Sequence, residues 1–185
     1  MVRKVFEGAK ALLSAAGLLP QFWPYAIRDY CFAENIKMVE GDSAWNRRFK
    51  KGHFRGPVIP FGCLVDFKQT PERADKMPKA APDAVPGIMF GYKLNPGGVW
   101  NGEFYFVALR EFADMDFPIW GSARNVSVQT VKEVWWDKKV VFPLLAKYHR
   151  ANTTIEGIEQ PRAGVEDCPP TVGNLQLVAE PPSVK

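Results

Sequence analysis

The residues most able to do chemistry in this chain are the cations of one short segment. Within nine positions this segment holds five basic side chains and one histidine: Arg47, Arg48, Lys50, Lys51, His53 and Arg55. Arginine and lysine neutralise phosphates, so such a density is typical of a surface that binds a nucleic acid. The spacing therefore predicts a nucleic-acid-binding segment with its five Arg and Lys residues as the contacts.

Three aromatic residues are interleaved with these cations: Trp45, Phe49 and Phe54. Aromatic rings that stand free beside a basic groove can stack on exposed bases. The same rings could instead anchor a solvated loop to the protein core, because each ring buries a large apolar area. The sequence leaves both interpretations open.

A second group of aromatic residues lies in the later half of the chain: Phe104, Tyr105, Phe106, Trp120, Trp135 and Trp136. Exposed rings on a small barrel can form a cage for a methylated lysine, since ring faces attract a cation. Packing in a core is the commoner role, and we expect it here. Successive side chains of a strand point to opposite faces, so one of Trp135 and Trp136 should be the exposed one.

Residues for metal-dependent or nucleophilic catalysis are not grouped in this sequence. Phosphodiester transfer by two metal ions needs carboxylates that converge on the cations. The acids of the first part of the chain are spread along helical faces, where most should be solvated: Glu7, Asp29, Glu34, Glu40 and Asp42. We therefore expect no catalytic residue and no enzymatic activity in this chain alone.

The histidines and cysteines do not predict a metal site either. His53 and His149 have no cysteine or carboxylate at ligand spacing, and Cys31, Cys63 and Cys168 form no Cys-x-x-Cys pair. Three widely separated cysteines also make a disulfide framework improbable. We expect neither a metal nor a cofactor, and a reducing compartment fits this cysteine usage best.

The charge is distributed unevenly along the chain. Residues 1–60 carry ten Lys and Arg against five Asp and Glu, whereas residues 151–185 carry two against five. A basic front half favours a polyanion such as DNA as the partner. No stretch approaches the roughly 18 apolar residues that span a membrane. We therefore expect a soluble protein of the nucleus or the cytoplasm, with no membrane partner.

Helical spacing dominates the first forty residues. Apolar residues recur at helical spacing from Val2 to Ala16, Gly17 supplies a stop, and Pro20 and Pro24 open a second helical pattern. Residues 1–40 should therefore form a helical hairpin. Residues 41–60 should form a basic linker, since their glycines and prolines break regular structure.

The later part of the chain is patterned as short strands, at residues 63–67, 87–94, 99–109, 126–136 and 140–145. Residues 95–98 and 137–139 should form hairpin turns, and residues 70–86 an insertion loop. Five short strands with tight turns predict a small barrel or strongly curved sheet over residues 61–150. The proline-rich acidic residues 151–185 should be a disordered tail. The predicted fold class is thus α+β.

Three segments together resemble copia-type retrotransposon integrases. They are Gly17-Leu18-Leu19-Pro20-Gln21-Phe22-Trp23, Phe61-Gly62-Cys63 and Gly87-Ile88-Met89-Phe90-Gly91-Tyr92. Each segment is weak by itself, but their order and spacing are specific, and the resemblance covers roughly residues 3–112. It implies a remnant of a ribonuclease-H-like integrase core at residues 1–40, the basic linker, and then an SH3-like β-barrel.

In that family the catalytic glutamate would precede Met1, so the resemblance implies a polyprotein fragment that does not catalyse integration alone. Such a fragment would contribute nucleic-acid binding and assembly to DNA integration, with DNA and other integrase subunits or a second copy as partners. Two alternatives stay open. One is a chromatin-reader or protein-interaction module that uses the barrel's aromatic residues, and the other is a decayed element with no activity.

Overall fold

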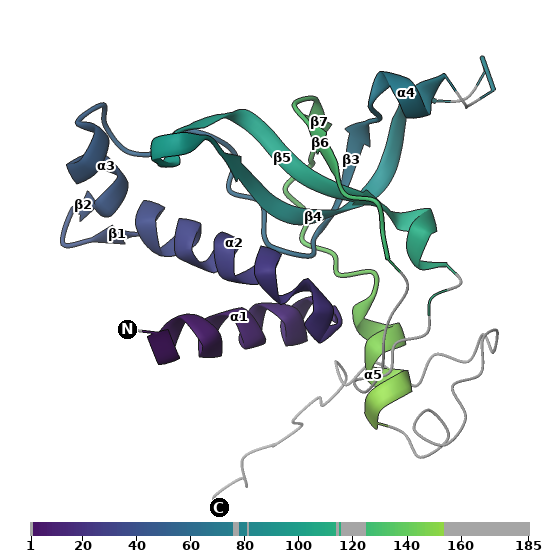
Figure 1. Cartoon of the computed structure of the whole chain (residues 1–185), viewed down its shortest axis with the longest axis horizontal. Helices are drawn as coiled ribbons and strands as arrows, with labels where there is room; N and C mark the ends of the chain where they lie inside the picture. Colours follow the sequence, from purple (N-terminus) through teal and green to yellow (C-terminus); the bar gives the residue numbers. More distant parts are fainter. Residues whose placement is uncertain (1, 76–77, 81, 114, 116–124, 154–185) are drawn as a thin grey trace, which may run out of the picture.

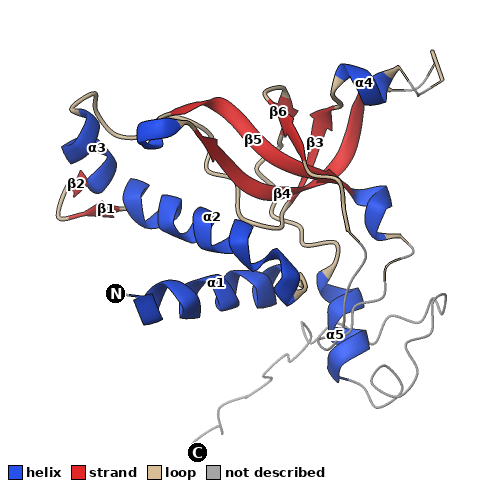
Figure 2. Cartoon of the chain, viewed as in Figure 1, coloured by secondary structure: helices blue, strands red, loops and turns tan. Residues whose placement is uncertain are grey.

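The computed structural model describes residues 2–75, 78–80, 82–113, 115 and 125–153. Helices at the N-terminus are followed by a five-stranded antiparallel sheet, so the predicted α+β class is confirmed. The strand order in this sheet is β6-β5-β4-β3-β7. The helical hairpin lies along one side of the sheet, as Figures 1 and 2 show.

The predicted helical hairpin is present. It consists of α1 (Val2–Ala16), the short 3-10 turn η1 (Pro20–Phe22) and α2 (Trp23–Ile36). Gly17 ends α1 with a φ of 66°, and the Leu18 N–H returns to the Leu13 carbonyl at 2.9 Å. The two helices approach closely at Gly8, where an added Cβ would lie 2.2 Å from the Tyr30 ring.

Part of the predicted basic linker, residues 41–60, has regular structure. Strands β1 (Met38–Val39) and β2 (Asp42–Ser43) form a small antiparallel ribbon, and the helix α3 (Ala44–Phe49) follows at once. The expectation that residues 41–60 lack regular structure was therefore wrong over residues 42–49. A local cap, described below, stabilises this helix despite the glycines around it.

The sheet and its connections have the following bounds: β3 (Leu64–Lys68), α4 (Pro71–Ala74), β4 (Ala84–Leu94), η2 (Pro96–Gly98), β5 (Trp100–Ala108), η3 (Leu109–Phe112), β6 (Gln129–Val131), β7 (Val134–Trp135) and α5 (Leu145–Thr153). The first three predicted strands and the turn at residues 95–98 are confirmed. The predicted insertion loop contains α4 and the first residues of β4.

Two of the predicted strands were wrong in detail. The apolar run at residues 126–136 forms β6 and β7, which pair with β5 and β3 at opposite edges of the sheet. Residues 140–145 form no strand, so residues 137–139 form no hairpin, and α5 begins at Leu145. Pro143 has no N–H for a strand ladder, which explains why the apolar run does not extend the sheet.

The sheet is curled. Only Lys132 and Glu133 separate β6 from β7, although these strands occupy opposite edges. The side-chain oxygen of Gln129 in β6 also accepts a hydrogen bond from the Thr70 N–H just after β3, at 3.4 Å. The described strands nevertheless form an open sheet and not a closed barrel.

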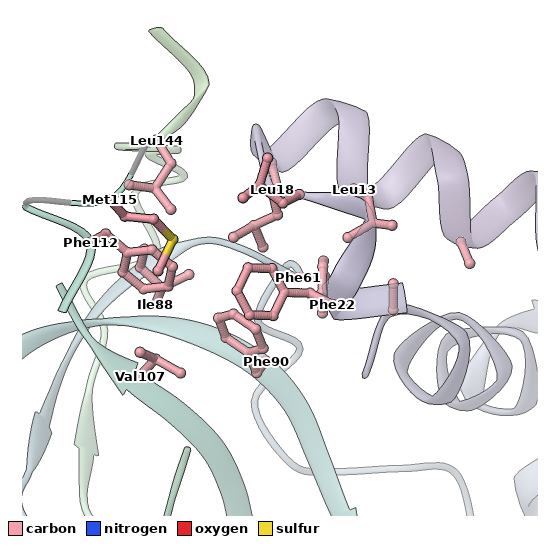
Figure 3. Packing of buried hydrophobic residues seen from close by; sticks show 14 residues of the cluster. Leu13, Leu18, Phe22, Phe61, Ile88, Phe90, Val107, Phe112, Met115 and Leu144 are labelled. Atoms are coloured by element: carbon pink, nitrogen blue, oxygen red, sulfur yellow. The ribbon is translucent and has the colours of Figure 1, made fainter. Parts of the chain in front are cut away.

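Two clusters of buried residues make up the core. The first joins the helical hairpin to the sheet and to α5, and Figure 3 shows Phe22, Phe61, Phe90 and Leu144 converging in it. The rings of Phe22 and Phe90 meet edge to face with centroids 5.0 Å apart. The second cluster lies within the curled sheet and extends to Phe32 of α2. Residues 151–153 end α5, while the remainder of the predicted disordered tail lies outside the described residues.

Candidate nucleic-acid interface

Helix α3 is held by hydrogen bonds that its own sequence supplies. Ser43 is the N-cap, and its Oγ accepts a hydrogen bond from the Asn46 N–H at 3.1 Å. Asp42 accepts from the Ser43 N–H at 2.8 Å and from the Asn46 side-chain amide at 2.9 Å. Asn46 also accepts from the Gly52 N–H at 3.0 Å. One asparagine thus ties the start of the helix to the loop after it.

The cap is electrostatic as well as geometric. Hydrogen bonds from Asn46 and Ser43 hold the pKa of Asp42 below its usual range, and the charges of Arg47 and His53 act in the same direction. His53 reaches back to the cap, with its Nδ1 3.2 Å from Ser43 Oγ. Asp42 is therefore an anion near the N-terminal end of α3, where the helix dipole favours negative charge.

The aromatic residues of the segment face the core. Trp45 packs edge to face on Phe32 of α2, with centroids 5.8 Å apart, and Phe54 packs on the same ring at 5.2 Å. Phe54 also lies 5.1 Å from Trp100 of β5. The anchoring interpretation is thus confirmed for Trp45 and Phe54, because their contacts join the segment to both α2 and the sheet.

Phe49 is half-buried, like Trp45 and Phe54, but one of its contacts is with a cation. Its ring centroid lies 4.5 Å from that of Trp45, and the guanidinium of Arg48 stands over the Phe49 ring at 5.4 Å. Arg48 also borders the turn between β4 and β5, where an added Cβ on Gly98 would lie 3.5 Å from its guanidinium. Figure 1 shows this turn beside α3.

We call the five predicted contacts the basic face: Arg47, Arg48, Lys50, Lys51 and Arg55. All five side chains are exposed, on α3 and the loop that follows it. Among the residues that the structure describes, none of the five forms an ion pair, whereas Lys4, Arg73 and Lys93 each have a carboxylate partner. The structure therefore brings the predicted residues together as exposed positive charge outside any ion pair with a described acid, although the charge of Arg47 acts on nearby Asp42.

Tyr92 holds the end of this segment in place, a role that no pattern in the sequence predicts. Its hydroxyl donates to the Pro57 carbonyl at 2.8 Å and accepts from the Ile59 N–H at 2.9 Å. Burial raises the pKa of the phenol well above its usual value, so the group stays protonated. The basic face is thereby carried on a segment anchored by Trp45 at one end and by Tyr92 at the other.

The aromatic residues of the sheet are mostly in the core, as predicted. Phe104 and Phe106 are buried and Tyr105 is half-buried. Trp136 packs against the second core cluster while Trp135 is 50% exposed, which confirms the predicted alternation. Trp120 lies outside the described residues.

One acid departs from the expectation of solvated carboxylates, because Asp29 of α2 is only 6% exposed. Glu7 and Glu34 lie at the surface in ion pairs with Arg3 and Lys4.

Within the described ranges, no three His, Cys, Asp or Glu side chains are close enough to hold a metal ion. Cys31 and Cys63 are free thiols, whereas Cys168 lies outside these ranges. None of the described helices has the length and apolar character needed to cross a membrane.

Comparisons with protein-family models, with curated proteins and with solved structures found no match to this chain. The resemblance to copia-type integrases therefore stays a prediction. The functional assignment of the basic face rests on its residues and their geometry.

Proposed function

We propose that this chain is a nucleic-acid-binding module that contacts phosphates through its basic face. The observation that carries this proposal is the exposure of five cations on one anchored segment, none of them in an ion pair among the described residues. Such charges are available to replace the counterions of a polyanion, and the release of those counterions drives binding.

The proposed binding mode is contact with the nucleic-acid backbone. Trp45 and Phe54 are engaged in the core, so neither ring is free to stack on a base. Phosphate contacts fix the position of a protein on its ligand but carry no direct sequence information. We therefore expect affinity that depends strongly on salt and weakly on base sequence.

We further propose that the module is the C-terminal part of a copia-type integrase, which holds DNA and partner subunits during integration without catalysing it alone. The packing of the three resembling segments supports this proposal. Phe22, Phe61 and Phe90 come one from each segment and meet in the first core cluster, and the Gly62 N–H donates to the Met89 carbonyl at 2.8 Å. A shared core explains why the three segments would occur together in one family.

The same proposal assigns the curled sheet to the SH3-like class, as a barrel that stays partly open. Support comes from the two-residue connection between the edge strands β6 and β7 and from the hydrogen bond between Thr70 and Gln129. A distance measurement in solution that places these two edges far apart would contradict this assignment.

The binding proposal is tested by fluorescence anisotropy with a labelled DNA duplex at a series of salt concentrations. The variant Arg47→Ala/Arg48→Ala/Lys50→Ala/Lys51→Ala should weaken binding and make the log–log salt dependence shallower by about 3 to 4, at roughly 0.9 per phosphate contact. Equal binding by this variant and the parent chain would refute the role of the basic face.

A matched control removes the same number of charges elsewhere, in the variant Lys10→Ala/Arg28→Ala/Lys79→Ala/Lys139→Ala. These four side chains are exposed and lie outside the basic face. The control should retain the salt dependence of the parent chain. If both variants lose affinity equally, the attraction comes from net charge and not from a defined face.

Two further experiments test the proposed role in assembly and the proposed lack of catalysis. Sedimentation of the chain with a long duplex should show more than one copy per DNA if it supports assembly. Incubation with DNA and Mg²⁺ or Mn²⁺ should give no strand-transfer product, and a product would overturn the non-catalytic assignment.

A second candidate function is favoured by one exposed ring. Trp135 of β7 is 50% exposed, and its cross-strand partner is the exposed acid Asp66 of β3. An aromatic face beside a carboxylate is a starting point for binding a methylated lysine. Binding of methylated histone peptides that is lost in Trp135→Ala would establish this function, whereas unchanged binding in that variant would exclude this ring as the site.

A further inference from the structure

Asp29 is a buried carboxyl group at the junction between α2 and β4. Its side chain is 6% exposed, and its Oδ1 accepts no hydrogen bond from any described residue. The carboxyl lies against Gly91, where an added Cβ would sit 3.3 Å from Oδ1. Gly91 has a φ of +113° and lies where the register between β4 and β5 shifts. The helix and the strand thus meet across an acid and a glycine.

The buried environment of Asp29 disfavours its ionised carboxylate. Burial raises the pKa of Asp29 to about 7, because the carboxylate loses its contact with water. The titratable neighbour from β4 is Tyr92, whose own pKa is raised in part by the charge of Asp29. The other charged groups of the elements packed against or adjoining this site are at the surface or ion-paired: Arg3, Lys4, Glu7 and Lys10 of α1, Arg28 and Glu34 of α2, Arg47 and Arg48 of α3, and Lys93 of β4. Among the described residues, no cation forms an ion pair with the buried carboxylate of Asp29.

The junction is continuous with the aromatic contacts that hold α3. Phe32 lies three residues after Asp29, on the same face of α2, and its ring centroid is 4.2 Å from that of Tyr92. Phe32 also packs against Trp45 and Phe54, the two anchors of the basic segment. A change in how α2 packs on β4 would therefore reach α3 through Phe32.

We propose that Asp29 is a proton-controlled contact between α2 and β4. With its proton the carboxyl is neutral and α2 stays packed against Gly91 and Tyr92. When the proton leaves, the buried charge favours a state in which the carboxylate reaches water, so the junction opens and the Phe32 contacts loosen. This inference concerns packing alone and does not depend on what the basic face binds.

Amide exchange of the full chain, followed by NMR between pH 6 and pH 8, tests this switch. Protection factors at Phe32, Gly91 and Tyr92 should fall about tenfold over this interval in the parent chain, as expected for a group whose pKa drops on opening. Asp29→Asn keeps the shape but cannot ionise, so its protection factors should stay constant. His53→Gln should behave as the parent chain, since His53 lies at the α3 cap and not at this junction.

The carboxyl carbon of Asp29 in the parent chain gives a readout that needs no variant to fold. A titration midpoint near neutral pH, at which the loss of protection levels off, supports the switch. It is overturned if the carbon titrates near the ordinary value of about 4, if protection stays constant while the carbon titrates, or if Asp29→Asn folds and shows the same loss as the parent chain.

Discussion

The indole of Trp45 in α3 packs edge to face against the ring of Phe32 in α2, with ring centroids 5.8 Å apart. This contact turns a sequence of alternating cations and aromatics into a two-sided segment. The aromatic side is bound to the helical hairpin and the sheet, and the cationic side is left to solvent. The fixed position of the basic face therefore depends on Trp45, a residue that carries no charge.

Replacing Trp45 with alanine should destabilise the folded chain. Trp45→Ala removes a half-buried ring from the second core cluster and should lower the free energy of unfolding by about 2 kcal/mol, below the range for fully buried aromatic residues. It should also weaken nucleic-acid binding, although it removes no charge. Urea unfolding checks the first effect, with Trp135→Ala as the control, since that exposed ring should change stability by about 0.5 kcal/mol or less.

The Tyr92 hydroxyl should contribute to the stability of the fold through its hydrogen bonds. Tyr92→Phe leaves the buried Ile59 N–H without its acceptor, and an unpaired buried donor costs about 1–3 kcal/mol. Tyr105→Phe is the matched control, because its half-buried hydroxyl has no hydrogen bond to a described residue. Equal stability of the two variants in urea would show that the hydrogen bonds of Tyr92 do not hold the end of the basic linker.

Gly62 should tolerate no side chain. It has a φ of 78°, and an added Cβ would lie 2.2 Å from the Cβ of Ala16. Gly62→Ala combines backbone strain with overpacking and should cost about 3 kcal/mol. Gly97→Ala separates the two causes, because Gly97 has a φ of 83° and open space around it. That control should lose only about 1 kcal/mol in thermal or urea unfolding.

The α3 cap should weaken in acid. The pKa of Asp42 is held below its usual value, so its contribution to stability is present above the unfolded pKa and is lost as the pH falls through the folded pKa. Amide protection at Ser43 and Asn46 should therefore fall as the pH drops below about 4, the ordinary value for an aspartate. Asp42→Asn should remove this dependence, and the same acid loss in that variant would assign the effect to another group.

The two carboxylates give opposite pH dependences. Asp29 has a raised pKa, so its contribution favours folding below the unfolded pKa near 4 and declines as the pH rises to about 7. Urea unfolding of the parent chain minus that of Asp29→Asn should show this decline, with no further change above neutral pH. A difference that grows with pH would have the wrong sign for a buried, unpaired acid.

Local sequence was a good guide wherever structure depends on neighbours in the chain. The hairpin of α1 and α2 follows from helical spacing and from Gly17, and the turn at residues 95–98 from its composition. The five cations of the basic face lie within nine positions, so they stay close to one another in any fold. The cap at Ser43 also depends only on neighbouring residues, but the glycines on either side of α3 argued against a helix there.

Tertiary structure alone decided which side of that segment meets the core. Whether Trp45 and Phe54 face a base or a protein depends on Phe32 and Trp100, which come from distant elements. The burial of Asp29, the division of residues 126–136 between two sheet edges and the role of Tyr92 depend likewise on long-range partners. Spacing fixes which residues are neighbours along a helix or strand, whereas burial is set by what packs against them, and that information is not local.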